Sequence, residues 1–199
     1  MSFTPRKLEA DAPVRPVPSK LAHLVFRTPR FEEMKRFYAL LLGARPVFES
    51  NEVCFMTYDD EHHRIGLINW PHLGDLDTKR AGLEHVAFTY RDLPSLLAAY
   101  RWNKERGIEP FWTINHGPTI SLYYRDPDGN KVELQHDVFA RAADLEAFFA
   151  SGAYEENFMG IVFDPEKMIA DYEAGVPIGT LTARPKLPQG ASPWDMMRE

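Results

Sequence analysis

One short strand-like pattern occurs twice in the chain, and this repeat constrains the fold more than any other feature. Residues 21–26 ("LAHLVF") and 83–88 ("LEHVAF") share the pattern Leu-x-His-x-x-Phe, and their histidines, His23 and His85, are 62 residues apart. A period of this length in only two copies does not fit most solenoids. We therefore expect a duplicated module whose two copies share one site.

Each copy continues with the same order of elements. A helical pattern follows each strand pattern, over residues 30–43 and 92–107, and both patterns end at a glycine. Three short strand patterns then complete each copy, over residues 45–50, 52–58, 62–69, 108–114, 119–125 and 130–135. The sequence predicts an α+β fold in which two βαβββ modules, residues 20–70 and 82–137, form one domain over residues 20–137.

The segments outside this domain have a different composition. Residues 1–19 are rich in proline and predict a flexible N-terminal arm. Residues 138–199 predict a C-terminal helical and irregular extension, with helical patterns over 142–152 and 164–175. We expect the extension either to wrap the domain or to cover a site.

Charge and hydropathy exclude several classes of function. The net charge is −6 and no basic stripe is present, which argues against a nucleic-acid partner. No apolar run approaches the ~20 residues that cross a bilayer, and the first residues lack the apolar core of a secretory leader. Cys54 is the only cysteine, so no intrachain disulfide or thiolate metal cluster can form. We expect a cytoplasmic protein that has no membrane partner and packs Cys54 in its core.

The two repeated histidines are candidate metal ligands. Strand alternation places each of them among apolar side chains. A single histidine there is more often a hydrogen-bonded core residue, but two at equivalent positions of a repeat favour metal ligation. Glu133 lies on the last strand of the second copy, where Gly66 is its counterpart in the first. Glu133 alone reads as a solvent-facing residue, whereas His23, His85 and Glu133 together match the two-histidine, one-carboxylate set that holds Fe(II).

The stretch "NHGPTISLYYRDPDGNKVEL" (residues 115–134) carries a more specific pattern. It contains His116, then Tyr123 seven residues later, then the turn "DPDGN", and then Glu133 ten residues after the tyrosine. On these motifs, residues 20–136 resemble the vicinal oxygen chelate superfamily, which includes glyoxalases, bleomycin resistance proteins and extradiol dioxygenases. Within it, the chain looks like a one-domain type I extradiol catechol dioxygenase.

The resemblance implies a cupped mixed sheet around a metal site with Fe(II), or Mn(II) as the alternative ion, held by His23, His85 and Glu133. It implies a small aromatic diol and O₂ as partners of the site, and a homo-oligomer, dimeric or larger.

Three further residues are implied as catalytic. His63 would be the acid–base residue near O₂, and Tyr123 would hydrogen-bond a substrate oxygen. His116 would position the substrate hydroxyl or assist proton transfer. The alternatives are a surface position for His63, a turn-capping role for His116 and a packing role for Tyr123. His63 lies three residues before Gly66, so a loop or bulge has to turn it inward.

Two other functions within the superfamily stay open. One is a metal-dependent isomerase or lyase of the glyoxalase type, which uses a fourth protein ligand at the position of Gly66. Glycine cannot supply that ligand. The other is a non-catalytic protein that binds a small molecule such as a drug in the same cup. The set of His23, His85 and Glu133 disfavours that alternative, because a metal-free binder has no use for it.

Overall fold

The structure, a computed structural model, describes residues 16–198, so most of the predicted N-terminal arm lies outside the described residues. The first module contains β1 (Leu24–Thr28), α1 (Phe31–Leu42), β2 (Arg45–Glu49), β3 (Val53–Thr57) and β4 (Ile65–Asn69). The second contains β5 (His85–Thr89), α2 (Leu93–Lys104), β6 (Trp112–Asn115), β7 (Thr119–Arg125) and β8 (Lys131–Asp137). The predicted order of elements is confirmed in both modules.

The extension contains more regular structure than its sequence predicts. It forms α3 (Ala142–Ala150), α4 (Ala153–Glu156), β9 (Ile161–Val162), α5 (Pro165–Glu173), α6 (Ile178–Thr182) and the short 3₁₀ helix η1 (Pro193–Met196). Both predicted helices are confirmed, and the side chain of Asp164 caps α5 by accepting a hydrogen bond from the Glu166 amide at 2.9 Å. Within residues 16–198, no helix is long and apolar enough to cross a membrane.

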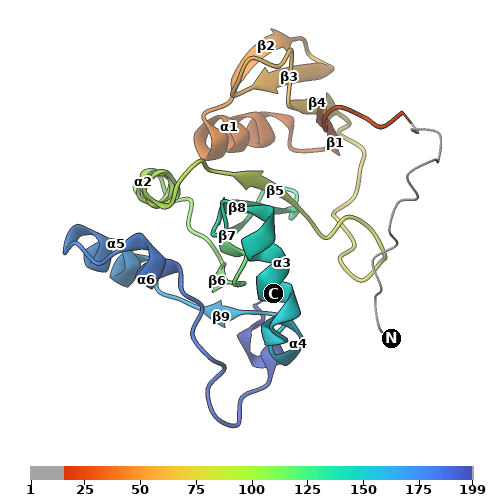
Figure 1. Cartoon of the computed structure of the whole chain (residues 1–199). Coiled ribbons are helices and arrows are strands. Elements are labelled where there is room, and N and C mark those ends of the chain that lie inside the picture. Colours follow the sequence, from red (N-terminus) through yellow and green to blue (C-terminus); the bar gives the residue numbers. More distant parts are fainter. Residues whose placement is uncertain (1–15, 199) are drawn as a thin grey trace.

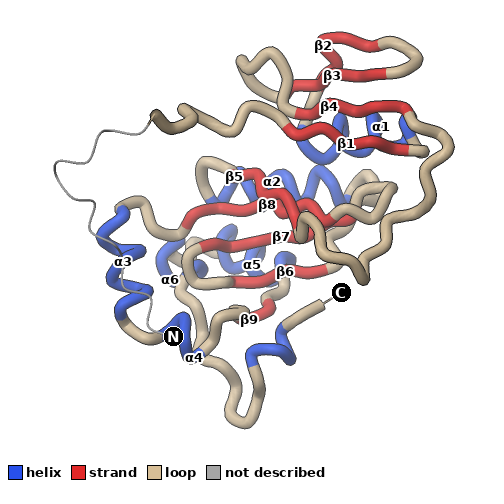
Figure 2. Tube along the Cα trace, turned by 90° about the vertical axis from the view of Figure 1, so that its right-hand side faces the viewer, coloured by secondary structure: helices blue, strands red, loops and turns tan. Residues whose placement is uncertain are grey.

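The strands form two mixed sheets with facing edges. Their orders are β1-β4-β3-β2 in the first module and β5-β8-β7-β6-β9 in the second. Figures 1 and 2 show β1 beside β5, so the two sheets follow one another as a single series of strands. The predicted cupped sheet is thus built from two sheets that are not hydrogen-bonded to each other, with α1 and α2 behind them in Figure 2.

The core lies between the sheets and these helices. Met34, Tyr38 and Leu41 follow one another at helical spacing on α1 and are buried, as are Leu93 and Leu96 on α2. One apolar cluster joins these side chains with those of β3, β4, β7 and β8. Burying each leucine contributes about 1.5–3 kcal/mol. The predicted core position of the only cysteine is also confirmed.

The turn between β7 and β8 ties the two modules together. The Tyr38 hydroxyl of α1 donates to Asp126 at 3.1 Å, and the Arg30 guanidinium donates to Asp128 at 3.0 Å. Asp126 also accepts from the backbone amides of Asp128 and Asn130, which closes the turn. Gly129 has a φ of +90°, a conformation that favours glycine. The turn therefore directs the chain back into β8 and holds this end of the second module against the first.

Strand registers confirm that Gly66 and Glu133 occupy equivalent positions. Val25 pairs with Gly66 across β1 and β4, and Ala87 pairs with Glu133 across β5 and β8. A Cβ on Gly66 would lie 3.1 Å from a Val25 methyl group and 3.5 Å from the Phe55 ring. The first module therefore has no carboxylate at this point and has little space for one.

We predict that replacing Tyr38 with Phe lowers the free energy of unfolding by about 1–2 kcal/mol, because buried Asp126 loses a hydrogen-bond donor. The control is Tyr124→Phe. Tyr124 is fully buried too, but its hydroxyl makes no hydrogen bond of normal geometry to the described residues. Denaturant titration of both variants measures the difference. Equal destabilisation by the two substitutions would contradict the role given to the Tyr38–Asp126 contact.

Candidate active site

The centre of the candidate site is the carboxylate of Glu133 on β8. The residue is 4% exposed, and one of its carboxylate oxygens lies 3.1 Å from Nε2 of His85 on β5. The other ring nitrogen of His85 pairs with the carboxylate of Glu84. Two carboxylates thus flank one imidazole at the start of β5.

This arrangement separates the charges of the pair at neutral pH. The hydrogen bond to Glu133 raises the pKa of His85 to about 9, and Glu84 adds to the rise while burial opposes it. Burial alone would raise the pKa of Glu133, but hydrogen bonds from His85 and Ser121 outweigh it and hold that pKa below its usual value. A positive charge therefore sits against a buried carboxylate. A nitrogen and an oxygen of this kind are also suitable ligands for a divalent metal ion.

Tyr123 lies directly opposite Glu133 in the β7–β8 register. Burial raises the pKa of its hydroxyl far above the ordinary value, and the negative charge of Glu133 raises it further. The hydroxyl is therefore a permanent proton donor near neutral pH. Its ring contacts the edge of His85 with 5.3 Å between ring centres and stacks on Trp112 at 4.7 Å.

His116, in the loop between β6 and β7, is held at both ring nitrogens. Nε2 lies 3.1 Å from the Tyr123 hydroxyl, and Nδ1 lies 2.5 Å from the backbone carbonyl of Met159. A carbonyl oxygen can only accept, so Nδ1 carries the proton and Nε2 of the neutral ring accepts from Tyr123. Burial lowers the pKa of His116, which favours the neutral ring. The second module thus brings together four of the predicted site residues: His85, His116, Tyr123 and Glu133.

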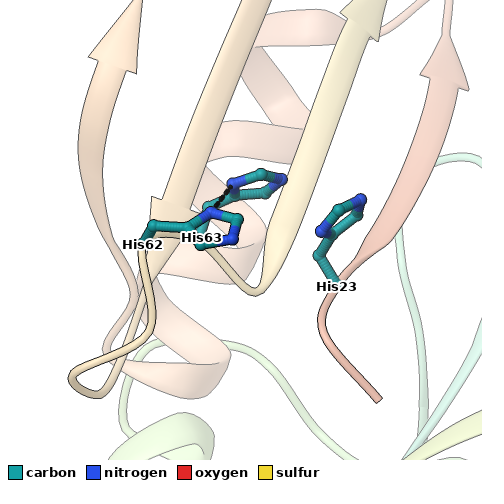
Figure 3. A group of neighbouring side chains, drawn as sticks. All are labelled: His23, His62 and His63. Carbon is teal, nitrogen blue, oxygen red and sulfur yellow. Dashed lines mark hydrogen bonds between the residues drawn. The ribbon is translucent and has the colours of Figure 1, made fainter. Parts of the chain in front are cut away.

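The first module contributes a cluster of three imidazoles (Figure 3). The rings of His23 and His63 stack with 4.3 Å between their centres, and Nδ1 of His62 lies 2.7 Å from Nδ1 of His63. One nitrogen of each ring lies within 4.8 Å of the others, so this cluster could hold a metal ion. Burial, together with the neighbouring His23, lowers the pKa of His63.

The parallel pairing of β1 with β4 explains this cluster. Because the two strands start at the same end of the sheet, the residues before them meet. The pairing of β3 with β4 ends at Ile65, so His63 precedes the strand. Its ring stacks at 4.6 Å on Phe55, which lies opposite Gly66. The loop therefore turns His63 toward the face of Gly66, as its spacing requires.

The structure divides the six predicted residues between two half-sites. Among the described residues, the ligand atoms of His23, His85 and Glu133 do not all lie within 4.8 Å of one another. His23 is exposed and precedes β1, the strand that lies beside β5.

Sequence reasoning missed the roles of two neighbours of the site. His62 is exposed, as expected, but contacts His63, and Glu84 pairs with His85. The adjacent histidines in "HHR" were the available signal for the first, whereas no pattern marked the second.

Comparisons with known proteins identify the family of the chain. Residues 20–134 match the model of the Glyoxalase/Bleomycin resistance protein/Dioxygenase superfamily. The chain is 42% identical over 164 residues to biphenyl-2,3-diol 1,2-dioxygenase 2 of Rhodococcus globerulus, covering 82% of this chain and 86% of that one. It is 41% identical over 170 residues to biphenyl-2,3-diol 1,2-dioxygenase 3 of the same organism, covering 84% and 90%.

A structural comparison supports the fold. The crystal structure of a glyoxylase/bleomycin resistance protein/dioxygenase domain from Frankia sp. EAN1pec matches with a TM-score of 0.51 and 19% identity, over 61% of this chain and 99% of that one. The family model covers the whole of both βαβββ modules except the last residues of β8. With two curated relatives above 40% identity over most of its length, the chain belongs to the Glyoxalase/Bleomycin resistance protein/Dioxygenase superfamily.

Proposed function

We propose that the protein is an Fe(II)-dependent extradiol dioxygenase that opens the ring of a catechol-type aromatic diol with O₂. The observation that carries the proposal is the buried contact between Glu133 and His85, with Tyr123 opposite Glu133 in the strand register. Two relatives named biphenyl-2,3-diol 1,2-dioxygenases support it and favour a biaryl diol as substrate. Assembly into a dimer or larger oligomer and a cytoplasmic location stay predictions.

The proposed metal ligands are His23, His85 and Glu133, with Fe(II) as the ion and Mn(II) as the alternative. The protonated ring of His85 places a positive charge beside the buried carboxylate of Glu133. A metal ion that replaces this proton would keep a positive charge there, so the pair fits such an ion. His23 would join them from the segment before β1 by turning away from His63, on which it stacks in this structure. When bound, Fe(II) supplies open coordination positions at which the diol and O₂ can meet and exchange electrons.

The side chains of the second module would bind and orient the diol. Tyr123 keeps its proton and donates a hydrogen bond to a substrate oxygen. Without substrate, Nε2 of His116 accepts from that hydroxyl; a bound diol oxygen would accept in its place, because the hydroxyl has only one proton. Holding the diol in one orientation supplies part of the rate acceleration.

His63 would move protons at the open side of the site. Its lowered pKa keeps the ring neutral near pH 7, so one nitrogen can accept a proton from the diol. The same nitrogen can return that proton during ring opening. Its position beside His23 is compatible with this role, because it places the base next to a proposed metal ligand.

One observation favours a different ligand set. His23, His62 and His63 already lie close enough together to hold an ion without any carboxylate. Such a site would leave buried Glu133 paired only with His85, and it would use His63 as a ligand instead of a base. A glyoxalase-type reaction has less support, since Gly66 offers no fourth ligand and its surroundings leave little room for one.

The first test measures iron and ring cleavage in protein purified without oxygen. We expect about one Fe(II) per chain, consumption of one O₂ per diol and a yellow ring-cleavage product from 2,3-dihydroxybiphenyl. Glu133→Gln should lower iron affinity by more than about 100-fold and abolish turnover, because loss of a direct ligand costs more than loss of its supporting contacts.

His62→Ala is the matched variant for the alternative ligand set. We expect its iron content and activity to stay near those of the native protein. If His62→Ala loses the iron and Glu133→Gln keeps it, the three-histidine cluster is the metal site and the proposed ligand set is wrong.

A second prediction concerns pH. His85 must lose its proton to bind a metal ion, and its pKa of about 9 means that protons compete with the ion at neutral pH. The affinity for Mn(II), a redox-stable probe, should therefore rise by about tenfold per pH unit between pH 7 and 8.5 and level off above the pKa.

Glu84→Gln tests the cause of that pH dependence. Glu84 is not a proposed ligand, but it raises the pKa of His85. In the variant, the affinity should level off at a lower pH than in the native protein. A metal affinity that does not change between pH 7 and 8.5 would mean that His85 is not a ligand.

A further inference from the structure

We propose that the C-terminal extension is part of the active site, because it fixes the tautomer and orientation of His116 through Arg184, Met159 and Gly160. This inference rests on the proposed function only for the role of His116 in catalysis. The contacts that carry it come from two separate parts of the extension, the loop before β9 and the segment after α6, and they reach Asn115 and His116.

The first contact sets the position of the proton on the ring. The loop between α4 and β9 turns the carbonyl of Met159 toward Nδ1 of His116, at 2.5 Å. This loop is itself fixed by the buried side chain of Asn157, whose amide nitrogen donates to the Gly160 carbonyl at 2.8 Å. The oxygen of the same amide accepts from the Met159 and Gly160 backbone amides at 3.2 and 2.9 Å. The carbonyl that holds His116 is therefore part of a rigid turn.

The second contact is a close approach of two backbones. Gly160 has a φ of +112°, and a Cβ built on it would lie 2.4 Å from the Asn115 carbonyl oxygen and 2.9 Å from Cα of His116. Any larger residue would push the loop away from His116. Next to this point, β9 pairs with β6 through Asn115 and Ile161, which fixes the register of the loop.

The third contact is a guanidinium that joins three segments. Arg184 follows α6, and its Nη1 donates to the His116 carbonyl at 3.0 Å and to the Asn157 carbonyl at 2.7 Å. Its Nη2 donates to the Ala153 carbonyl at 2.5 Å, and the group lies over the Phe148 ring. One side chain thus connects the His116 loop to both α4 and the Met159 turn.

These contacts have a consequence for the site. With Nδ1 protonated, Nε2 of His116 can only accept, and the hydroxyl of Tyr123 must point its proton toward the ring or toward a bound oxygen. Without the extension, either tautomer could form and the ring could turn. Arg184 and Gly160 are therefore positioning residues, since they act through His116 and do not touch the proposed metal ligands.

The main experiment is Arg184→Met, with Arg106→Met as the matched control. Arg106 also donates to a backbone carbonyl, that of Trp102 at 2.9 Å, and its guanidinium lies over the Trp102 ring. It differs from Arg184 in its place, which is just after the C-terminal end of α2. The readout is the ¹⁵N NMR spectrum of the histidine rings in metal-free protein, with the His116 signals assigned by their loss in His116→Gln. We expect the Nδ1-protonated tautomer in the native protein and in Arg106→Met, and a mixture of tautomers in Arg184→Met.

Gly160→Ala gives a second variant in case Arg184→Met does not fold. Its control is Gly175→Ala, which has a similar backbone strain (φ +86°) but no atom within 4 Å of the added Cβ. We expect Gly160→Ala to change the His116 signals and Gly175→Ala to leave them unchanged. A native His116 protonated on Nε2, or native signals in both Arg184→Met and Gly160→Ala, would overturn the inference.

Turnover adds a functional readout. With iron content unchanged, we expect Arg184→Met to lower kcat about tenfold through misplacement of His116. In a protein that already carries His116→Gln, adding Arg184→Met should lower kcat by less than about twofold, because the two residues act through one contact. Equal losses in both backgrounds would contradict action through His116. If the native protein cleaves no diol, the proposed function fails, while the ring signals still test the inference.

Discussion

The buried carboxylate of Glu133 is the constraint on which the site depends. A carboxylate removed from water needs a positive charge or several hydrogen bonds beside it. Here β5 supplies the His85 ring, and Ser121 on β7 also helps to lower the pKa of the carboxylate. The strand order β5-β8-β7 places the carboxylate between these two neighbours, so the sheet topology itself creates a place for a cation.

The duplicated module accounts for the asymmetry of the site. Both modules have the same parallel pairing of first and last strands, and both carry a histidine at the start of the first strand. They differ at the position where the first has Gly66 and the second has Glu133. The first module therefore supplies imidazoles without a carboxylate. The first module docks on the turn between β7 and β8, and this contact brings its half-site beside that of the second module.

Much of this could be predicted from the sequence because a repeat allows internal comparison. The order of elements and the equivalence of Gly66 and Glu133 follow from aligned strands, whereas the place of Tyr123 beside Glu133 was implied by the family resemblance. The extension has no second copy, so its contacts had no comparable signal. Met159 lies 43 residues from His116, and its contribution is a backbone carbonyl, which no residue type reveals. The two-residue strand β9 is likewise too short to show a pattern.

The rotamer of His23 also lay beyond sequence reasoning. An exposed histidine at the start of a strand can turn toward either neighbouring half-site, and here it stacks on His63. Ligation by His23 together with Glu133 is therefore the central claim of the account. X-ray absorption of the iron-loaded protein tests it most directly. We predict two imidazole nitrogens and one carboxylate around the iron. Three imidazoles and no carboxylate would contradict the account.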